Sequence, residues 1–364
     1  MTFQRLHAAA LLLLAGVVPL ALAGCFDDHH LNAASPVADS PSLAGDARGF
    51  GKVVVANRGS GTISVLDAAS GTSLGDFSLP SGTATPEPMY VSYVARTHAV
   101  IVGDRANDRV VEFDADNFSV TRTAPAGAGV FHMWVDGVAS GQLWVNNDVD
   151  NTSTVIDPVS FDVMATVPMP ADLVAMGARP HDVVLDPLGR HAYVTLLAPG
   201  PEDYVVQFDT GSFLETARAA VGKDPHVSLT ARNQLLYVPC QNSNVVEVLH
   251  RGTLEPVTSI AVPGAHGAAM TRSGLVFYTT NLPGGGTNAL FAIDTRSNEV
   301  IGDPADSPYG VPHNVALSTN GQRLFLTHSG GAADKVTFYD ASAGLALLGE
   351  ATVGLNPFGI AFVP

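Results

Sequence analysis

Histidine recurs at one position of a repeated sequence pattern. A Pro-His pair opens a short apolar run at His181, His226 and His313, and weaker copies carry His266 and His132. Two further copies keep the frame without histidine, at Met89 and Phe358. Neutral imidazole is a standard ligand of copper and zinc, so a fold that gathers these positions predicts a metal site. No thiolate or carboxylate recurs there, which disfavours a soft-sulfur or calcium site.

The recurrence of histidine is also compatible with two roles that involve no metal. Duplication of a Pro-His unit would spread histidine through the repeats without selecting for a ligand. The side chains would equally suit a polar channel opening in which they bind water.

The spacing of the copies indicates the elements that carry them. The copies recur at intervals of 40 to 49 residues, and seven of them span the chain from Met89 to Phe358. This period, with four short strands per unit, predicts an all-β, seven-bladed β-propeller. The chain enters with three strands of one blade and leaves with the fourth, Phe358 to Val363. The closing blade is therefore expected to be shared by the N- and C-terminal segments, which removes exposed sheet edges.

The repeat units resemble those of the YVTN β-propeller family. The first unit has a strand at 52–56, a turn at 57–61, an alternating strand at 62–66 and a terminal Asp67. The resemblance spans about residues 52–364. It implies that the histidine positions open the innermost strands, so that His132, His181, His226, His266 and His313 converge on one mouth of the central channel. His328, where a second strand ends, is expected at the same face.

A histidine-only copper site at the hub of a seven-bladed propeller is the arrangement in nitrous oxide reductase. The similarity here is restricted to the hub histidines. Met89 and Phe358 stand where histidine would be needed, and no cupredoxin domain is present. The resemblance therefore implies copper, or zinc, without implying the nitrous oxide reaction.

The N-terminal segment resembles a bacterial lipoprotein signal peptide. A short basic start is followed by an apolar run and by Leu22-Ala23-Gly24-Cys25, the order of a lipobox with its lipidated cysteine. We expect a signal peptide at 1–24, lipidation of Cys25, a flexible tether at 25–50 and the propeller at 51–364. Phe26 after the cysteine implies the outer membrane, facing the periplasm.

Composition limits the partners. The formal net charge of −16 disfavours nucleic acid and offers no basic patch for anionic lipid, so membrane attachment would depend on Cys25. The second cysteine, Cys240, has no partner within the folded domain and is interpreted as a small buried hydrophobe.

Several other polar groups are interpreted as structural. An Asp ends the third strand of six repeats, where its side chain is expected to cap the following turn. The Asn- and Asp-rich segment 146–151 lacks the spacing of a calcium loop and is expected to be a turn.

The sequence thus predicts an anchored, periplasm-facing binding protein with a histidine-lined channel mouth that holds a metal ion or a small ligand. A lactonase-like hydrolase, with Glu87 and Arg179 as its candidate carboxylate and arginine, is one alternative. A scaffold that binds a protein partner through its blade surfaces is another.

Overall fold

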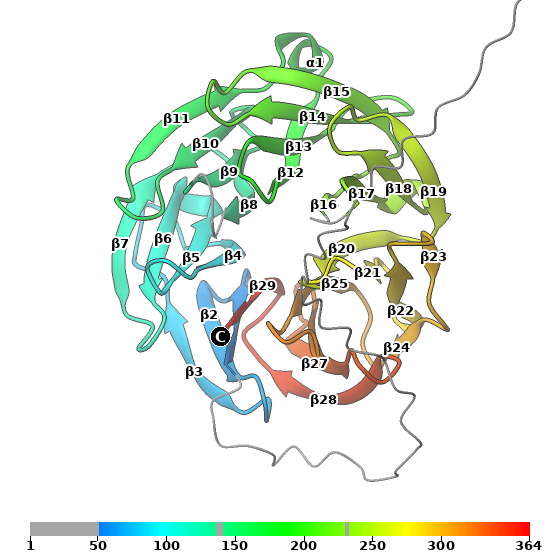
Figure 1. The fold of residues 1–364 in the computed structure, drawn as a ribbon. Coiled ribbons are helices and arrows are strands. Elements are labelled where there is room, and N and C mark those ends of the chain that lie inside the picture. Colours follow the sequence, from blue (N-terminus) through cyan, green and yellow to red (C-terminus); the bar gives the residue numbers. More distant parts are fainter. Residues whose placement is uncertain (1–50, 136–140, 230–232) are drawn as a thin grey trace, which may run out of the picture. The chain divides into compact units, whose positions relative to one another are not determined.

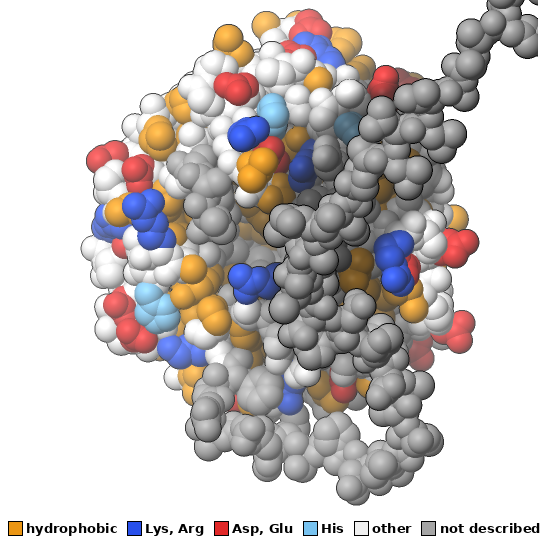
Figure 2. Space-filling view, viewed as in Figure 1, with side chains coloured by type: hydrophobic (Ala, Val, Ile, Leu, Met, Phe, Trp, Pro, Cys, Tyr) orange, Lys and Arg blue, Asp and Glu red, His pale blue; other side chains and the backbone are white. Residues whose placement is uncertain are grey.

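A computed structural model describes residues 51–135, 141–229 and 233–364. Within these residues the chain forms a seven-bladed β-propeller (Figure 1; Figure 2 shows the same view in space-filling form), as the repeat period predicted. The predicted signal peptide, Cys25 and the tether lie outside the described residues. No helix in the described part is long and apolar enough to cross a membrane.

Each blade has an inner strand beside the channel and a second strand paired to it. The inner strands are β4 (Pro88–Val94), β8 (Val130–Val135), β12 (Arg179–Leu185), β16 (Ser228–Leu229), β20 (Ala265–Met270), β25 (Pro312–Leu317) and β29 (Pro357–Val363). The second strands are β5 (Ala99–Asp104), β9 (Leu143–Asn147), β13 (His191–Leu197), β17 (Leu235–Cys240), β21 (Val276–Asn281), β26 (Arg323–His328) and β1 (Lys52–Asn57).

The third and outer strands complete the antiparallel sheets. The third strands are β6 (Arg109–Asp114), β10 (Thr152–Ile156), β14 (Asp203–Asp209), β18 (Val245–His250), β22 (Gly286–Asp294), β27 (Lys335–Asp340) and β2 (Thr62–Asp67). The outer strands are β7 (Val120–Pro125), β11 (Val163–Pro168), β15 (Glu215–Val221), β19 (Pro256–Ala261), β23 (Glu299–Val300) with β24 (Ala305–Ser307), β28 (Ala346–Thr352) and β3 (Ser73–Ser78). Short helical turns are α1 (Ala171–Ala175), η1 (Arg105–Asn107) and η2 (Gln241–Ser243).

The ring closes as predicted, because the last strand pairs with the first. The sheet order β29-β1-β2-β3 joins the two ends of the propeller in one blade. One blade departs from four strands, since β23 and β24 both pair with β22 and divide the outer position between them.

The hydrophobic core consists of seven clusters, one in each interface between neighbouring blades. The cluster of Val53, Leu66, Phe325 and Val336 joins the last full blade to the closing blade. The apolar, largely β-branched strands supply both faces of each sheet, which packs on two neighbours. A rigid set of inner strands thus surrounds the channel.

The aspartates at the strand ends cap turns, as predicted. Asp67 Oδ1 accepts hydrogen bonds from the backbone N–H groups of Ala69 and Ser70. The same pair of bonds recurs at Asp114, Asp157 and Asp209, and Asp294 and Asp340 accept the first of the two.

Candidate metal centre

At the start of every inner strand, two residues that follow the first paired residue leave the strand ladder. In β12, for example, Pro180 pairs with Leu196 and Val183 with Val194, while the two residues between them are unpaired. A bulge of this kind re-aims side chains, and ring contacts between blades show that most of the residues concerned meet around the axis. We call them the first and second hub positions. The first positions are Met89, Phe131, His181, His226, His266, His313 and Phe358, and the second are Tyr90, His132, Asp182, Val227, Gly267, Asn314 and Gly359.

This register corrects the predicted position of His132. Val130 pairs with Asn147 and Met133 with Val145, so Phe131 is the equivalent of His181. His132 occupies the second position, one residue later than the other four histidines. Sequence alignment of the repeats put His132 at the first position because it matched histidine with histidine, whereas in this copy Val130 holds the place of the proline.

Threonine hydroxyls hold the bulges in place. Thr280 Oγ1 accepts a hydrogen bond from Gly267 N at 2.8 Å and donates to His313 O of the next blade at 2.8 Å. Thr327 repeats the arrangement with Asn314 N and Phe358 O. Each threonine therefore fixes a hub position in its own blade and in the neighbouring one.

The aromatic rings at the first positions form a layer across the channel. Neighbouring centroids are 4.7 Å apart for His181 and His226, 3.9 Å for His226 and His266, and 4.6 Å for His266 and His313. Phe358 and Phe131 continue the layer beside His313 and His181. The predicted convergence is thus present, but the histidines are buried, at 2 to 9% exposure, rather than open at a channel mouth.

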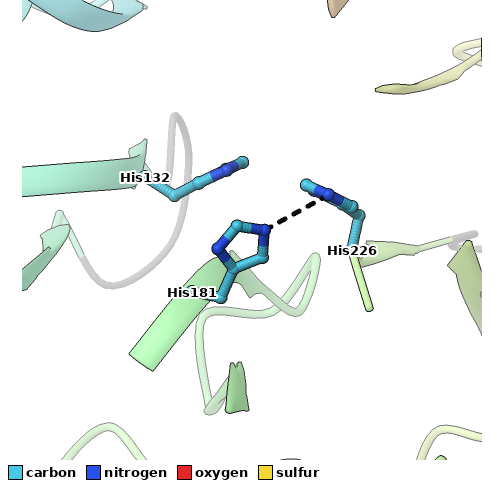
Figure 3. A group of neighbouring side chains, drawn as sticks. All are labelled: His132, His181 and His226. Carbon is cyan, nitrogen blue, oxygen red and sulfur yellow. Dashed lines mark hydrogen bonds between the residues drawn. The ribbon is translucent and has the colours of Figure 1, made fainter. Parts of the chain in front are cut away.

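Three of the histidines approach closely enough to share an ion. One ring nitrogen from each of His132, His181 and His226 lies within 4.8 Å of the others. The rings come from three successive blades and point toward a common centre (Figure 3), with 3.3 Å between Nε2 of His181 and Nε2 of His226.

The carboxylate of Asp182 contacts the Nδ1 side of two of these rings and so orients them. Its Oδ1 lies 2.8 Å from His132 Nδ1, and its Oδ2 lies 3.5 Å from His226 Nδ1. The carboxylate also accepts hydrogen bonds from the backbone N–H groups of Val183 and Val227. Burial raises the pKa of Asp182, but His132 and His226 outweigh it, so that the pKa lies well below its usual range. The contact at Nδ1 leaves Nε2 of His226 for a ligand, whereas Nε2 of His132 lies 2.6 Å from Tyr90 OH, which a bound ion would displace.

Burial keeps the imidazoles of His132 and His181 neutral. It lowers the pKa of His132 despite the opposing effect of Asp182. The pKa of His181 lies well below its usual value, because burial is reinforced by the imidazoles of His226 and His132. Neutral imidazole is the form that binds a metal ion.

The two remaining hub histidines lie beside the trio. His313 Nδ1 is 2.8 Å from Asn314 Nδ2, and burial, followed by the effect of His226, lowers its pKa to about 3. Neither ring nitrogen of His266 has a hydrogen-bond partner among the described residues, although the side chain is 5% exposed. Burial also places the pKa of His266 well below its usual value. A buried polar group without a partner is rare and calls for a ligand or a cost in stability.

His328 takes no part in this cluster. Its Nδ1 lies 3.1 Å from Gly310 O, and its Nε2 contacts the hydroxyls of Thr337 and Ser307. Burial lowers its pKa to about 4. Both ring nitrogens of His328 thus have protein partners at the end of β26.

Sequence analysis did not single out the functional groups at the second positions. Tyr90 OH lies 2.6 Å from His132 Nε2, and Asn314 Nδ2 lies 3.4 Å from the same hydroxyl. Together with Asp182, these residues directly follow the first-position residue in their repeats. A polar residue at that place in several copies was the available signal.

The structure does not bring the predicted hydrolase pair together. Glu87 accepts a hydrogen bond from Arg58 Nε at 2.6 Å, while Arg179 is exposed. No hydrogen bond or ion pair joins Glu87 to Arg179 in the described part of the chain.

One structural interpretation is confirmed and another only in part. Cys240 is fully buried in a blade interface, and burial raises its pKa. In the segment 146–151, residues 148–151 form the expected turn, in which Asp148 pairs with Arg105. Asn146 and Asn147 instead belong to β9, where they are fully buried and bond the hydroxyls of β10.

Comparisons with known proteins support the fold alone. No family model and no curated protein matches the sequence, so membership of the YVTN family stays a prediction. Hydrazine synthase from Kuenenia stuttgartiensis is similar in structure, with a TM-score of 0.63 and 17% identity, over 78% of this chain and 91% of that chain. The dihydro-heme d1 dehydrogenase NirN, solved in complex with DHE, has a TM-score of 0.61 and 14% identity, over 87% of this chain and 76% of that chain. A Bacteroides fragilis protein proposed as a 6-phosphogluconolactonase has a TM-score of 0.67 and 14% identity, over 88% of this chain and 100% of that chain.

Proposed function

We propose that this protein is a cell-envelope β-propeller that binds a copper or zinc ion through His132, His181 and His226. The observation that carries the proposal is the approach of three buried ring nitrogens from three blades to within 4.8 Å. Two nitrogens that are each 2.0–2.1 Å from a tetrahedral zinc ion lie about 3.3–3.4 Å apart. The two Nε2 atoms of His181 and His226 are already 3.3 Å apart.

The surroundings of the trio support the same proposal. Asp182 contacts Nδ1 of two ligands, as carboxylates do behind the histidines of many metal sites. The pKa of His132 and that of His181 are lowered, so no proton has to be displaced from these rings at neutral pH. Inner strands fixed on both sides by packed blades hold the ligands more rigidly than loops would.

The test is metal stoichiometry and affinity after chelation, exposure to zinc or copper, and dialysis. The protein should carry no purification tag histidines and should have His29 and His30 replaced by Ala. We expect about one equivalent of metal on this parent. The double variant with His181→Ala and His226→Ala should lose the ion, and Asp182→Asn should weaken binding about 10- to 100-fold.

A double variant with His191→Ala and His250→Ala is the matched control. Both residues lie outside the hub, at strand ends, and should leave the metal content unchanged. Equal metal on the two double variants would contradict the proposal and leave a protein-binding scaffold as the alternative.

The location in the envelope is a proposal that rests on Cys25. The Leu22-Ala23-Gly24-Cys25 sequence supports lipidation at the mature N-terminus. Detergent partitioning of a Cys25→Ala variant tests it, and unchanged membrane association would contradict the anchor.

A further inference from the structure

A cavity of about 570 Å³ lies in the channel next to the histidine layer. It begins at the second hub positions and follows the inner strands to their ends, where exposed Arg272 and Thr319 line it. Its walls are largely apolar and include Val91, Val135, Val315, Leu317, Ile360 and Phe362. An apolar pocket with a few converging polar groups is the usual form of a small-molecule site.

The polar groups of the cavity floor present acceptors. Because Asp182 Oδ1 accepts from Nδ1–H of His132, Nε2 of that ring is an acceptor in the neutral form. Tyr90 therefore donates its O–H to His132, at 2.6 Å, and turns its oxygen lone pairs outward. Asn314 Nδ2 donates toward one of them at 3.4 Å.

Asn314 adds a second acceptor. Its Nδ2 is directed to Phe358 O at 3.1 Å and to His313 Nδ1 at 2.8 Å, which identifies this atom as the amide nitrogen. No hydrogen bond to its Oδ1 occurs among the described residues. The floor thus requires a donor from whatever occupies the cavity.

We propose that this cavity binds a small uncharged alcohol or phenol with an apolar body, its hydroxyl directed to Tyr90 and Asn314. An ammonium group would also donate, but the apolar walls would remove its hydration, and the carboxylate of the lining, Asp182, is already paired with His132 Nδ1 and with the backbone N–H groups of Val183 and Val227. The site goes beyond the proposed metal function and does not require the ion.

The test compares 2-naphthol with 2-methoxynaphthalene, which has the same apolar body but no donor. Fluorescence titration of the full chain, with chelator present, measures both affinities. We expect saturable 2-naphthol binding that is about tenfold tighter than binding of the ether. The ether has no donor, so its complex would leave the buried acceptors unpaired and lose about that factor in affinity. Absence of binding, or equal affinity for the two compounds, would overturn the proposal without any variant being needed.

Variants then locate the site. Tyr90→Phe should reduce the preference for 2-naphthol to within about threefold, since the ring remains and the acceptor is lost. Tyr93→Phe is the matched control, because Tyr93 also lines the cavity but its hydroxyl contacts His98 Nδ1 at 2.9 Å. Ser92→Phe should fill the channel and abolish binding of both compounds.

A thermal melt of each variant confirms that it is folded. A preference that survives Tyr90→Phe in a folded protein would contradict the proposal. Because chelator is present throughout, a failed metal test leaves this outcome unaffected, and the two proposals can fail separately.

Discussion

At the scale of single residues, the hub histidines couple stability to pH. His132, His181, His266 and His313 all have a lowered pKa in the folded protein. An unfolded histidine titrates near 6.5. Above that pH both states are neutral, and the stability is fully present. As the pH falls below it, the unfolded chain binds protons that the folded hub excludes, so stability is lost down to the folded values, about 3 for His313.

We therefore predict that the chelated protein loses unfolding free energy between pH 7 and pH 5. Each of these four histidines contributes at most about 1.4 kcal/mol per pH unit in this window. His266→Phe, which places at this position the residue found at Phe131 and Phe358, should reduce the pH dependence. It should also raise stability at pH 5, because it removes two unpartnered nitrogens. Urea unfolding at pH 7, 6 and 5 measures both effects, and a pH-independent parent would contradict the assignment of neutral histidines.

At the scale of the elements, the bulge that opens each inner strand is what creates the hub. It breaks the two-residue alternation of the strand and so re-aims the side chains at the hub positions. The bulge also leaves a backbone N–H group without its partner in the strand ladder. In three blades the hydroxyl of a threonine on the second strand accepts a hydrogen bond from this group. These threonines also link neighbouring blades, because the hydroxyls of Thr280 and Thr327 donate to a backbone carbonyl of the next inner strand.

Thr327→Val tests this device with little change in shape. It leaves Asn314 N and Phe358 O without their buried partner, and we expect a loss of about 1–3 kcal/mol of unfolding free energy. Thr352→Val on the exposed outer strand of the same blade is the control and should cost less than about 0.5 kcal/mol. Chemical denaturation measures the unfolding free energy of both variants. Equal losses would show that the hydrogen bonds of Thr327 do not stabilise the hub.

At the scale of the whole molecule, stability depends on closure. Each interface cluster needs both of its blades, and β29 belongs to the interfaces on both sides of the closing blade through Ile360, Ala361 and Phe362. It also pairs with β1 and forms part of the cavity wall. Its loss would leave β1 as an open edge and expose two interfaces.

Removal of residues 356–364 should therefore destabilise the entire propeller. We expect a lower and broader thermal transition, not the loss of one local element. A synthetic peptide of the same residues, added in excess, should restore the transition by pairing with β1. A truncated protein that melts at the parent temperature with the parent cooperativity would contradict the role of β29 in closure.

The sequence by itself determined those features that each repeat specifies locally. The period, the four strands per blade, the closing strand at Phe358 and the turn-capping aspartates follow from patterns within one unit, and the structure has them. The ligand chemistry of imidazole also made the histidines candidates before any geometry was known.

Only the tertiary structure decided how the hub is arranged. The register of one bulge placed His132 at the second position, and ring closure buried the histidines and brought Asp182 behind two rings. The partners of Tyr90 and the isolation of His266 likewise depend on which blades face each other across the channel. A repeat pattern records local backbone preferences, whereas contacts across the axis join residues from different repeats, and no single unit encodes them.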